Sequence, residues 1–236
     1  MTHVKICGFQ RAEDALVAAE AGADAIGLVF VPSARRRLPI EQAEKLLTEF
    51  KGRWGKRPMP RWFGLFADQP VDEVNGIATR LGLDAVQLCG TEGMGYCREM
   101  VVPLAKVIAV DSSLPQAVIL PKLMTLLQRH TLAGHELVLD TFVQGAYGGT
   151  GQSFDWRLAA ELAQAFKFNL AGGLRPENVE EAVRLVRPWG VDTSSGVESD
   201  GQKDPARLRT FVETVHKADK AMAPKGLHAL LRRVRR

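Results

Sequence analysis

Cysteine and long apolar runs are both scarce in this chain. It has three cysteines among 236 residues, an odd and small number that does not suit the disulfide framework of a secreted domain. A reducing, cytoplasmic location is therefore expected. No apolar run approaches the ~18 residues of a membrane-spanning helix, and no basic region followed by an apolar one opens the chain as in a signal peptide. The composition therefore favours a globular protein without a membrane partner.

Charge is unevenly distributed along the chain. The formal net charge is +4, yet residues 217–236 hold seven Lys and Arg against one Asp, or +6, which leaves −2 for the rest. We therefore expect a near-neutral domain over 1–216 and a basic C-terminal tail over 217–236. A solvated tail is the prediction, and binding to nucleic acid or another acidic surface is the alternative.

Eight short apolar runs alternate with segments of helical periodicity. The runs cover 4–7, 25–30, 62–67, 85–88, 105–110, 136–141, 167–171 and 190–193. The helical segments cover 11–21, 40–51, 71–81, 96–101, 115–130, 156–165, 177–186 and 205–217. Units of ~30 residues with nearly continuous apolar strands are typical of parallel βα repeats.

Eight such units predict an α/β fold, a (β/α)8 TIM barrel, as a single domain with a basic C-terminal extension. A doubly wound open sheet is the alternative, but it usually carries a glycine-rich turn after its first strand. Here that turn reads Gly8-Phe9-Gln10, with one glycine only. Asp155, Pro176 and Asp204 are expected helix starts, and residues 51–61 are the expected flexible loop.

Active sites of such barrels form at the C-terminal ends of the strands. There the first strand ends at Cys7 and the sixth reaches Asp140. A thiol and a carboxyl have ordinary pKa values on either side of neutrality, so they suit a catalytic base and acid. Cys7 as an inert filler and Asp140 as a cap or an ion-pair partner are the alternatives.

Glycine and serine follow the last strands in the pattern of a phosphate site. Gly172 and Gly173 follow the seventh strand, and Ser194, Ser195 and Gly196 follow the eighth. Free backbone N–H groups and small hydroxyls bind anions, and barrels often bind phosphate at these two strands. The glycines of the YGGTGQ segment, Gly148, Gly149 and Gly151, are expected to contribute. Simple turns are the alternative.

The histidines give no sign of a metal or of metal-dependent chemistry. His3, His130, His135, His216 and His228 show no ligand spacing, and His135, which precedes the sixth strand, is expected to be structural. We therefore predict no metal.

These segments resemble one enzyme family over residues 4–198. The similar segments are VKICG, GADAIGLVF, PSARRR, GLFAD, AVQLCG, VLDTFVQGAYGGTGQSFDW, LAGGLRPENV and VDTSSGVE. They resemble the phosphoribosylanthranilate isomerases, cofactor-free barrel enzymes of tryptophan biosynthesis. The resemblance implies an Amadori rearrangement of N-(5-phosphoribosyl)anthranilate into an aminodeoxyribulose phosphate.

The resemblance also implies roles for single residues. Cys7 would be the general base and Asp140 the general acid. Arg36 would hold the anthranilate carboxylate, with Arg35 and Arg37 as neighbours that leave the assignment open by one position. Gln87 and Asp192 would contact the substrate, a small phosphosugar.

The chain departs from the family pattern after the fourth strand. The family usually shows QLHG there, whereas this chain has Gln87-Leu88-Cys89-Gly90. By strand alternation Lys5 shares the face of Cys7, and we hypothesise that it supports the Cys7 thiolate. A lysine that fills a layer of the barrel interior and pairs with a carboxylate is the alternative. Another sugar-phosphate isomerase of the same barrel type is the nearest alternative function, and a non-enzymatic protein that binds through its basic tail is the second. A monomer or a homodimer is expected.

Overall fold

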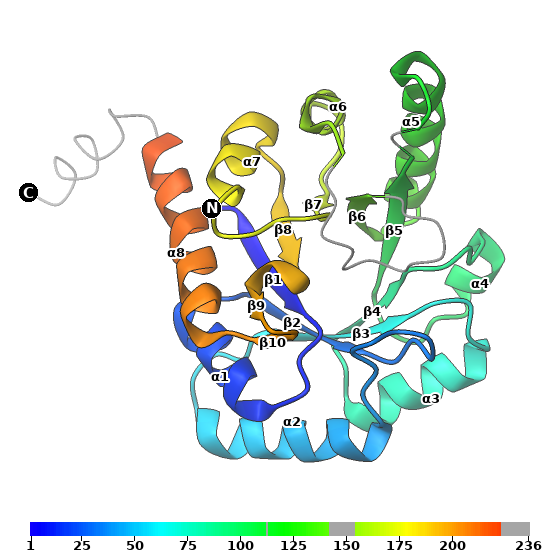
Figure 1. The fold of residues 1–236 in the computed structure, drawn as a ribbon. Coiled ribbons are helices and arrows are strands. Elements are labelled where there is room, and N and C mark those ends of the chain that lie inside the picture. The colour runs from blue at the N-terminus through cyan, green and yellow to red at the C-terminus, as the bar shows by residue number, and fades with distance from the viewer. Residues whose placement is uncertain (112, 142–153, 223–236) are drawn as a thin grey trace, which may run out of the picture.

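The structure is a computed structural model that describes residues 1–111, 113–141 and 154–222. Within these residues eight parallel strands pair in sequence order and close into a barrel (Figure 1). The strands are β1 (His3–Cys7), β2 (Ala25–Val29), β3 (Arg61–Phe66), β4 (Ala85–Leu88), β5 (Leu104–Val110), β6 (Glu136–Thr141), β7 (Asn169–Leu170) and β8 (Gly190–Thr193). The predicted (β/α)8 barrel is thereby confirmed.

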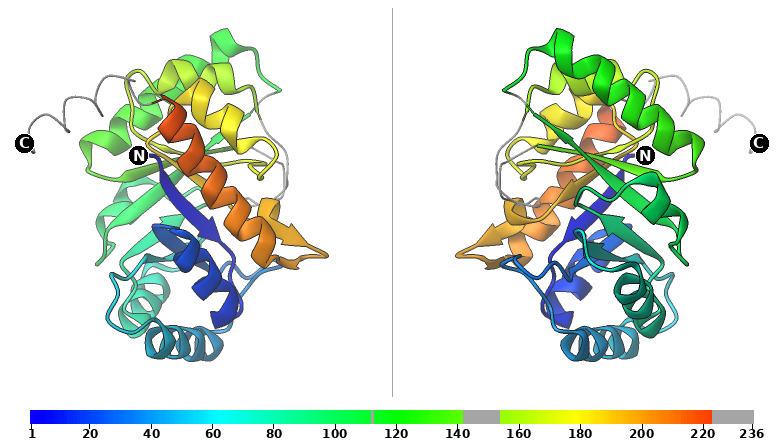
Figure 2. Two further views of the ribbon diagram at one scale, coloured as in Figure 1. Left: turned by 90° about the vertical axis from the view of Figure 1, so that its left-hand side faces the viewer. Right: turned by 90° about the vertical axis from the view of Figure 1, so that its right-hand side faces the viewer.

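A helix follows each strand and packs outside the barrel (Figure 2). The helices are α1 (Ala12–Ala21), α2 (Ile40–Trp54), α3 (Val71–Leu81), α4 (Met94–Arg98), α5 (Gln116–Leu132), α6 (Trp156–Leu162), α7 (Val179–Val186) and α8 (Pro205–Met222). The helix stop expected at Gly22 has a φ of 103°, which favours glycine.

Strand alternation divides the apolar side chains into two layers. The large outer layer joins strands and helices through residues such as Ile6, Leu28 and Phe66. A smaller set faces the inside of the barrel and includes Cys7, Phe63 and Ala105. Because successive side chains point to opposite faces of a strand, Cys7 reaches the barrel interior while Ile6 anchors the strand from outside.

Several local features differ from the sequence prediction. Strand β7 covers only Asn169–Leu170 where 167–171 was expected, and α4 covers Met94–Arg98 where 96–101 was expected. Helix α2 extends to Trp54 rather than ending at 51, because Trp54 stacks on Phe50 and its Nε1 donates to the Pro58 carbonyl oxygen at 3.0 Å. Helix α7 begins at Val179, since Pro176 lies in a turn instead of opening the helix. A short hairpin of β9 (Glu198–Ser199) and β10 (Gln202–Lys203) was not predicted.

The last helix crosses the boundary drawn at residue 217. Ala218 in α8 is fully buried, and the Asp219 carboxylate accepts hydrogen bonds from the backbone and hydroxyl of Thr2 at 2.6 and 2.7 Å. Residues 217–222 therefore pack as part of the barrel, whereas the rest of the expected tail lies outside the described residues.

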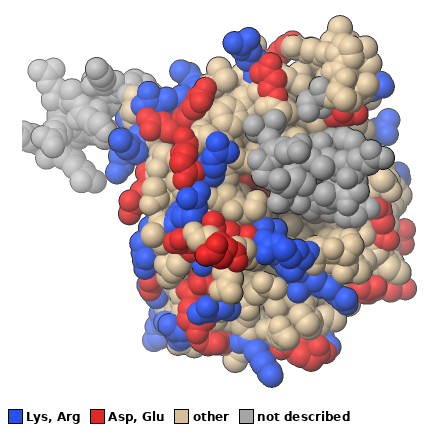
Figure 3. All heavy atoms as spheres, viewed as in Figure 1, with Lys and Arg blue, Asp and Glu red and all other residues tan. Residues whose placement is uncertain are grey.

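The surface of the barrel mixes charges of both signs. Acidic and basic side chains are interspersed over the face shown in Figure 3. Among the described residues, no helix combines the length and the apolar character needed to cross a bilayer.

Candidate active site

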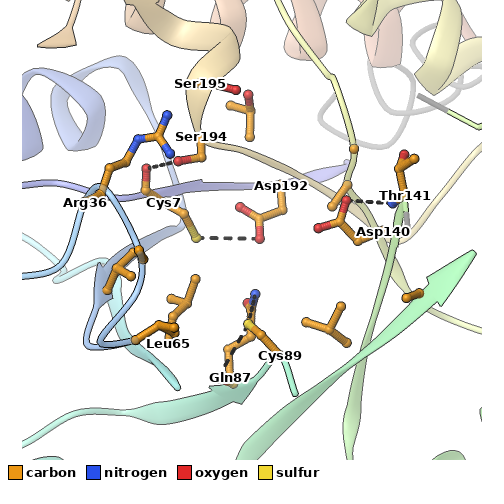
Figure 4. A pocket seen from close by; sticks show the side chains of 18 of the residues that line it. Cys7, Arg36, Leu65, Gln87, Cys89, Asp140, Thr141, Asp192, Ser194 and Ser195 are labelled. Atoms are coloured by element: carbon orange, nitrogen blue, oxygen red, sulfur yellow. Dashed lines mark hydrogen bonds between the residues drawn. The ribbon is translucent and has the colours of Figure 1, made fainter. Parts of the chain in front are cut away.

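The C-terminal mouth of the barrel contains a cavity of about 490 Å³. Its lining includes every described residue that the sequence analysis assigned to the site (Figure 4). These residues are Cys7, Arg36, Gln87, Asp140, Gly172, Gly173, Asp192, Ser194, Ser195 and Gly196. Gly148, Gly149 and Gly151 lie outside the described residues.

Cys7 belongs to a buried cluster with a lysine and an aspartate. The Lys5 ammonium lies 2.6 Å from Cys7 Sγ and 2.6 Å from Asp192 Oδ2. Cys7 Sγ in turn lies 3.6 Å from Asp192 Oδ2. Strand alternation on β1 places Lys5 and Cys7 on one face, and the parallel pairing of Lys5 with Asp192 across β1 and β8 brings the carboxylate to them.

The cluster keeps the thiol protonated in the free site. Burial and the Asp192 charge raise the pKa of Cys7 to about 12, although the Lys5 ammonium lowers it. Burial disfavours the charged form of Lys5, but Asp192 and Cys7 together raise the pKa of Lys5 above its ordinary value. Lys5 therefore stays charged and is paired with Asp192, while Cys7 remains a neutral thiol beside them.

Asp140 lies at the end of β6, across the cavity from Cys7 (Figure 4). Burial raises the pKa of its carboxyl to about 6, and a hydrogen bond from the Thr141 backbone N–H at 2.7 Å opposes this shift only in part. A carboxyl with this pKa can hold a proton near neutrality and donate it. The site thus contains an acid and a thiol on opposite walls.

The glycines after β7 bring the backbone close to the cavity. Gly172 and Gly173 have φ values of 91° and 64°, in the region that favours glycine. A Cβ at Gly172 would collide with the Thr141 hydroxyl, and one at Gly196 with the Leu174 carbonyl oxygen. Only glycine fits at these two positions, so the backbone itself lines this wall.

Arg36 is the innermost of the three consecutive arginines. Its side chain is 12% exposed, compared with 56% for Arg35, and both pair with the buried Glu198 carboxylate. Burial raises the pKa of Glu198, but Arg36 and Lys203 outweigh it and hold this pKa at about 2. Glu198 therefore fixes the Arg36 guanidinium at the edge of the cavity.

Two polar atoms that line the cavity have no partner among the described residues. They are Gln87 Oε1 and Asp192 Oδ1, both buried. The Gln87 amide nitrogen lies 3.7 Å from Cys89 Sγ, the thiol found where the family usually has histidine. Because a buried acceptor without a hydrogen bond is costly, these two oxygens are suited to hydroxyl groups of a ligand.

Sequence reasoning gave no role to three residues that shape the site. Glu198 orients Arg36, and Lys203 donates to the Ser194 carbonyl oxygen at 2.8 Å. A Cβ at Gly27 of β2 would lie 2.5 Å from Cys7 Sγ, so this glycine makes room for the thiol. Glu198 closes the VDTSSGVE segment and Gly27 lies within the GADAIGLVF segment, and membership of these segments was the only signal for either residue.

The comparisons with known proteins identify the family of the chain. The family model described as N-(5'phosphoribosyl)anthranilate (PRA) isomerase matches residues 4–214. An N-(5'-phosphoribosyl)anthranilate isomerase of Roseiflexus castenholzii is 41% identical over 220 residues, which cover 91% of this chain and 98% of the relative. The enzyme of the same name from Dehalococcoides mccartyi is 37% identical, with 93% and 98% covered.

Solved structures extend the likeness to the fold. The crystal structure of phosphoribosyl anthranilate isomerase from Thermotoga maritima has a TM-score of 0.78 and 32% identity, covering 92% of this chain and all of that one. A further crystal structure of a phosphoribosyl anthranilate isomerase, in complex with reduced 1-(o-carboxyphenylamino)-1-deoxyribulose 5-phosphate, has a TM-score of 0.75 with 32% identity and the same coverage. On the family match and the identity of these relatives, the chain belongs to the N-(5'-phosphoribosyl)anthranilate isomerase family.

Proposed function

We propose that Cys7 is the general base and Asp140 the general acid with which this chain isomerises N-(5'-phosphoribosyl)anthranilate to 1-(o-carboxyphenylamino)-1-deoxyribulose 5-phosphate. The observation that carries the assignment is that a thiol and a carboxyl of raised pKa face one cavity from opposite strands of the barrel. The chemistry needs one proton donated and one removed, and no cofactor enters it.

Asp140 acts first, on the ribose ring oxygen. Its proton moves to that oxygen as the C1–O bond breaks, and the anthranilate nitrogen supplies its lone pair to C1. The product of this step is an open-chain iminium ion with a free hydroxyl. A carboxyl with a pKa of about 6 is protonated in roughly a tenth of the molecules at pH 7, far more than a carboxyl of ordinary pKa, so it can serve as a general acid.

Cys7 then removes the proton from the neighbouring C2. The electron pair of that C–H bond forms the C1–C2 double bond and neutralises the iminium nitrogen, giving an enolamine that tautomerises to the ketone. The Cys7 pKa of about 12 belongs to the free site, where the single proton of the pair lies on the sulfur. The reacting form is therefore the minor one in which this proton has moved to the Asp140 carboxyl and Cys7 is a thiolate. A cationic iminium beside the sulfur, together with Lys5 at 2.6 Å, favours the thiolate when the base is needed.

The remaining residues are assigned to binding. The phosphate would lie against the backbone at Gly172, Gly173 and Gly196 and the hydroxyls of Ser194 and Ser195. Arg36, held by Glu198, would pair its planar guanidinium with the anthranilate carboxylate. Asp192 Oδ1 and Gln87 Oε1, which lack protein partners among the described residues, would accept hydrogen bonds from the sugar hydroxyls. The name of the ligand in the related complex contains the same three groups, a phosphate, a carboxyphenyl group and a sugar.

Turnover of the two variants Cys7→Ser and Asp140→Asn tests the assignment. Each change keeps the shape of the side chain but removes the base or the acid, so kcat should fall by ~10²-fold or more while KM changes little. The loss of substrate fluorescence follows the reaction. Asp72→Asn, an exposed carboxylate in α3, is the matched control and should keep full activity. Full activity in Cys7→Ser or Asp140→Asn would refute the role assigned to that residue.

Location and assembly remain predictions. Cys7, Cys89 and Cys97 are all free thiols, which supports a reducing, cytoplasmic location. The related Thermotoga maritima enzyme is described as dimeric, which supports a homodimer here; size-exclusion chromatography with light scattering would separate it from a monomer.

A further inference from the structure

A cluster of one cysteine and two histidines lies away from the active site. Cys97 comes from α4, His130 from the last turns of α5, and His135 from the connection between α5 and β6. One ligating atom from each residue lies within 4.8 Å of the other two. None of the three lines the cavity at the barrel mouth, so the catalytic machinery gives no reason for the cluster.

The two imidazoles face each other through their Nδ1 atoms, which are 2.9 Å apart. Their rings are tilted by 44°, with centroids 5.2 Å apart. The backbone holds this arrangement: the His135 N–H donates to the His130 carbonyl oxygen at 3.1 Å, and Gly134 turns the chain with a φ of 78°. Two facing nitrogens can share a single proton, or they can share a metal ion.

The donor set and its spacing suit a zinc-type ion. In a tetrahedral zinc site with Zn–N of ~2.05 Å and Zn–S of ~2.3 Å, two nitrogens are ~3.3 Å apart and a nitrogen and a sulfur ~3.6 Å apart. The observed nitrogen spacing needs an expansion of only a few tenths of an ångström. Since the ligating atoms lie within 4.8 Å of one another, the sulfur must approach by ~1.2 Å at most. Thiolate and imidazole ligands together select zinc over magnesium or calcium.

The surroundings of the cluster tolerate a cation. Cys97 and His130 are 3% and 4% exposed, whereas His135 is only partly buried. Lys106 acts electrostatically on both Cys97 and His130, but its charge is compensated by Glu92, whose Oε2 lies 2.6 Å from Lys106 Nζ. The partly exposed side of His135 leaves the fourth coordination position open to a water molecule.

We propose that Cys97, His130 and His135 form a structural binding site for a divalent zinc-type ion. Cys97 binds as a thiolate and releases its proton to solvent. The two histidines bind through Nδ1, and each then carries its hydrogen on Nε2. The ion links α4 to the C-terminal end of α5 and to the start of β6. It thereby stabilises the packing of these outer helices at a place away from the active site.

Cobalt titration of the metal-free, untagged full chain tests the proposal. Co²⁺ bound to a thiolate gives a near-ultraviolet charge-transfer band and visible ligand-field bands. We expect one Co²⁺ per chain, displaced by one equivalent of Zn²⁺. Cys97→Ser should abolish the charge-transfer band, and His135→Gln should weaken binding at least ~10-fold. Cys89→Ser and His216→Asn, a thiol and an imidazole outside the cluster, should keep the band.

Thermal unfolding provides the second readout and guards against misfolded variants. Circular dichroism without metal establishes that each variant folds. Free Zn²⁺ at ~100-fold above its Kd should raise the Tm of the unmodified chain by about 5–10 °C and leave that of Cys97→Ser unchanged. No charge-transfer band in the unmodified chain would overturn the proposal, as would a band that survives in Cys97→Ser and disappears in Cys89→Ser.

Discussion

At the scale of single residues, the proposed base depends on a shared lysine. Lys5 Nζ lies equally close to Cys7 Sγ and to Asp192 Oδ2, at 2.6 Å. The ammonium lowers the Cys7 pKa and so offsets part of the rise that burial and the Asp192 charge cause. The sequence could predict that Lys5 and Cys7 share a face, because alternation along a strand is local. It could not predict the short contact with Asp192, which depends on the register between the first and last strands.

Replacing Lys5 by Met should impair the base. Without the ammonium, the Asp192 charge acts on Cys7 unopposed, so the Cys7 pKa should rise further and kcat should fall by ~10- to 100-fold. The pH dependence of Cys7 alkylation, followed by mass spectrometry of its peptide, measures the thiol pKa directly.

Lys106→Met is the matched control for this substitution. Lys106 is also a buried strand lysine paired to a carboxylate at 2.6 Å, and it lies outside the cavity lining. Both Lys106→Met and Lys5→Met should lower the Tm, because each leaves a carboxylate without its lysine partner. Lys106→Met should nevertheless leave the Cys7 pKa unchanged. An unchanged Cys7 pKa in Lys5→Met would remove Lys5 from the mechanism.

The pKa values of Asp140 and Cys7 set the acid side of the pH profile. In the reacting form, Asp140 and Cys7 together carry one proton, since Asp140 is protonated and Cys7 is not. That total stays at one between the Asp140 pKa of about 6 and the Cys7 pKa of about 12. Below pH 6 a second proton binds, so kcat/KM should fall ~10-fold per pH unit.

Initial rates between about pH 5 and pH 8 check this profile. The Asp72→Asn control should keep the same acid limb, because its carboxylate lies outside the cavity lining. A kcat/KM that stays level down to pH 5 would contradict the assignment of Asp140 as the group that titrates.

At the scale of elements, strands and long helices could be predicted because their patterns are local. The predicted bounds agree with the structure at β4, β6, β8 and α3. The Asp155 cap is also confirmed, since its carboxylate accepts from the Arg157 N–H. The extension of α2 to Trp54 was missed, because basic and glycine residues suggested a loop while packing of Trp54 on Phe50 decided for a helix.

The β2 strand contributes to the site through the absence of a side chain at Gly27. Gly27 pairs with Cys7 across β1 and β2, and a Cβ there would lie 2.5 Å from the sulfur. Gly27→Ala should therefore displace the thiol and lower kcat by ~10-fold or more, with the barrel still folded by circular dichroism.

Gly52→Ala is the matched control in α2, where nothing lies within 4 Å of the added methyl group. It should keep full activity and stabilise the helix by ~0.5–1 kcal/mol, because alanine restricts the unfolded chain. Equal activity in the two variants would show that the thiol tolerates displacement and that β2 does not position it.

At the scale of the whole molecule, the N-terminal segment is hydrogen-bonded to the last helix, α8. Thr2 donates to Asp219 twice, and Ala218 is buried against the barrel. The sequence placed a boundary before residue 217 because the charge changes there. A change in charge along the sequence does not mark where a helix stops packing. Helix α8 continues past residue 217, and its apolar face makes contacts as far as Met222.

Two truncations separate the packed end of α8 from the basic residues beyond it. A chain ending at Met222 keeps both hydrogen bonds of Thr2 to Asp219 and should retain full turnover and Tm. A chain ending at His216 loses Ala218 and the Asp219 hydrogen bonds, and should melt several degrees lower at the ~2–4 °C per kcal/mol typical of this size. Turnover below the melting range should be the same in both, because none of the described residues that either cut removes lines the cavity. Loss of turnover on ending the chain at Met222 would mean that residues 223–236 act in catalysis, against the division of the molecule into a catalytic barrel and a separate basic tail.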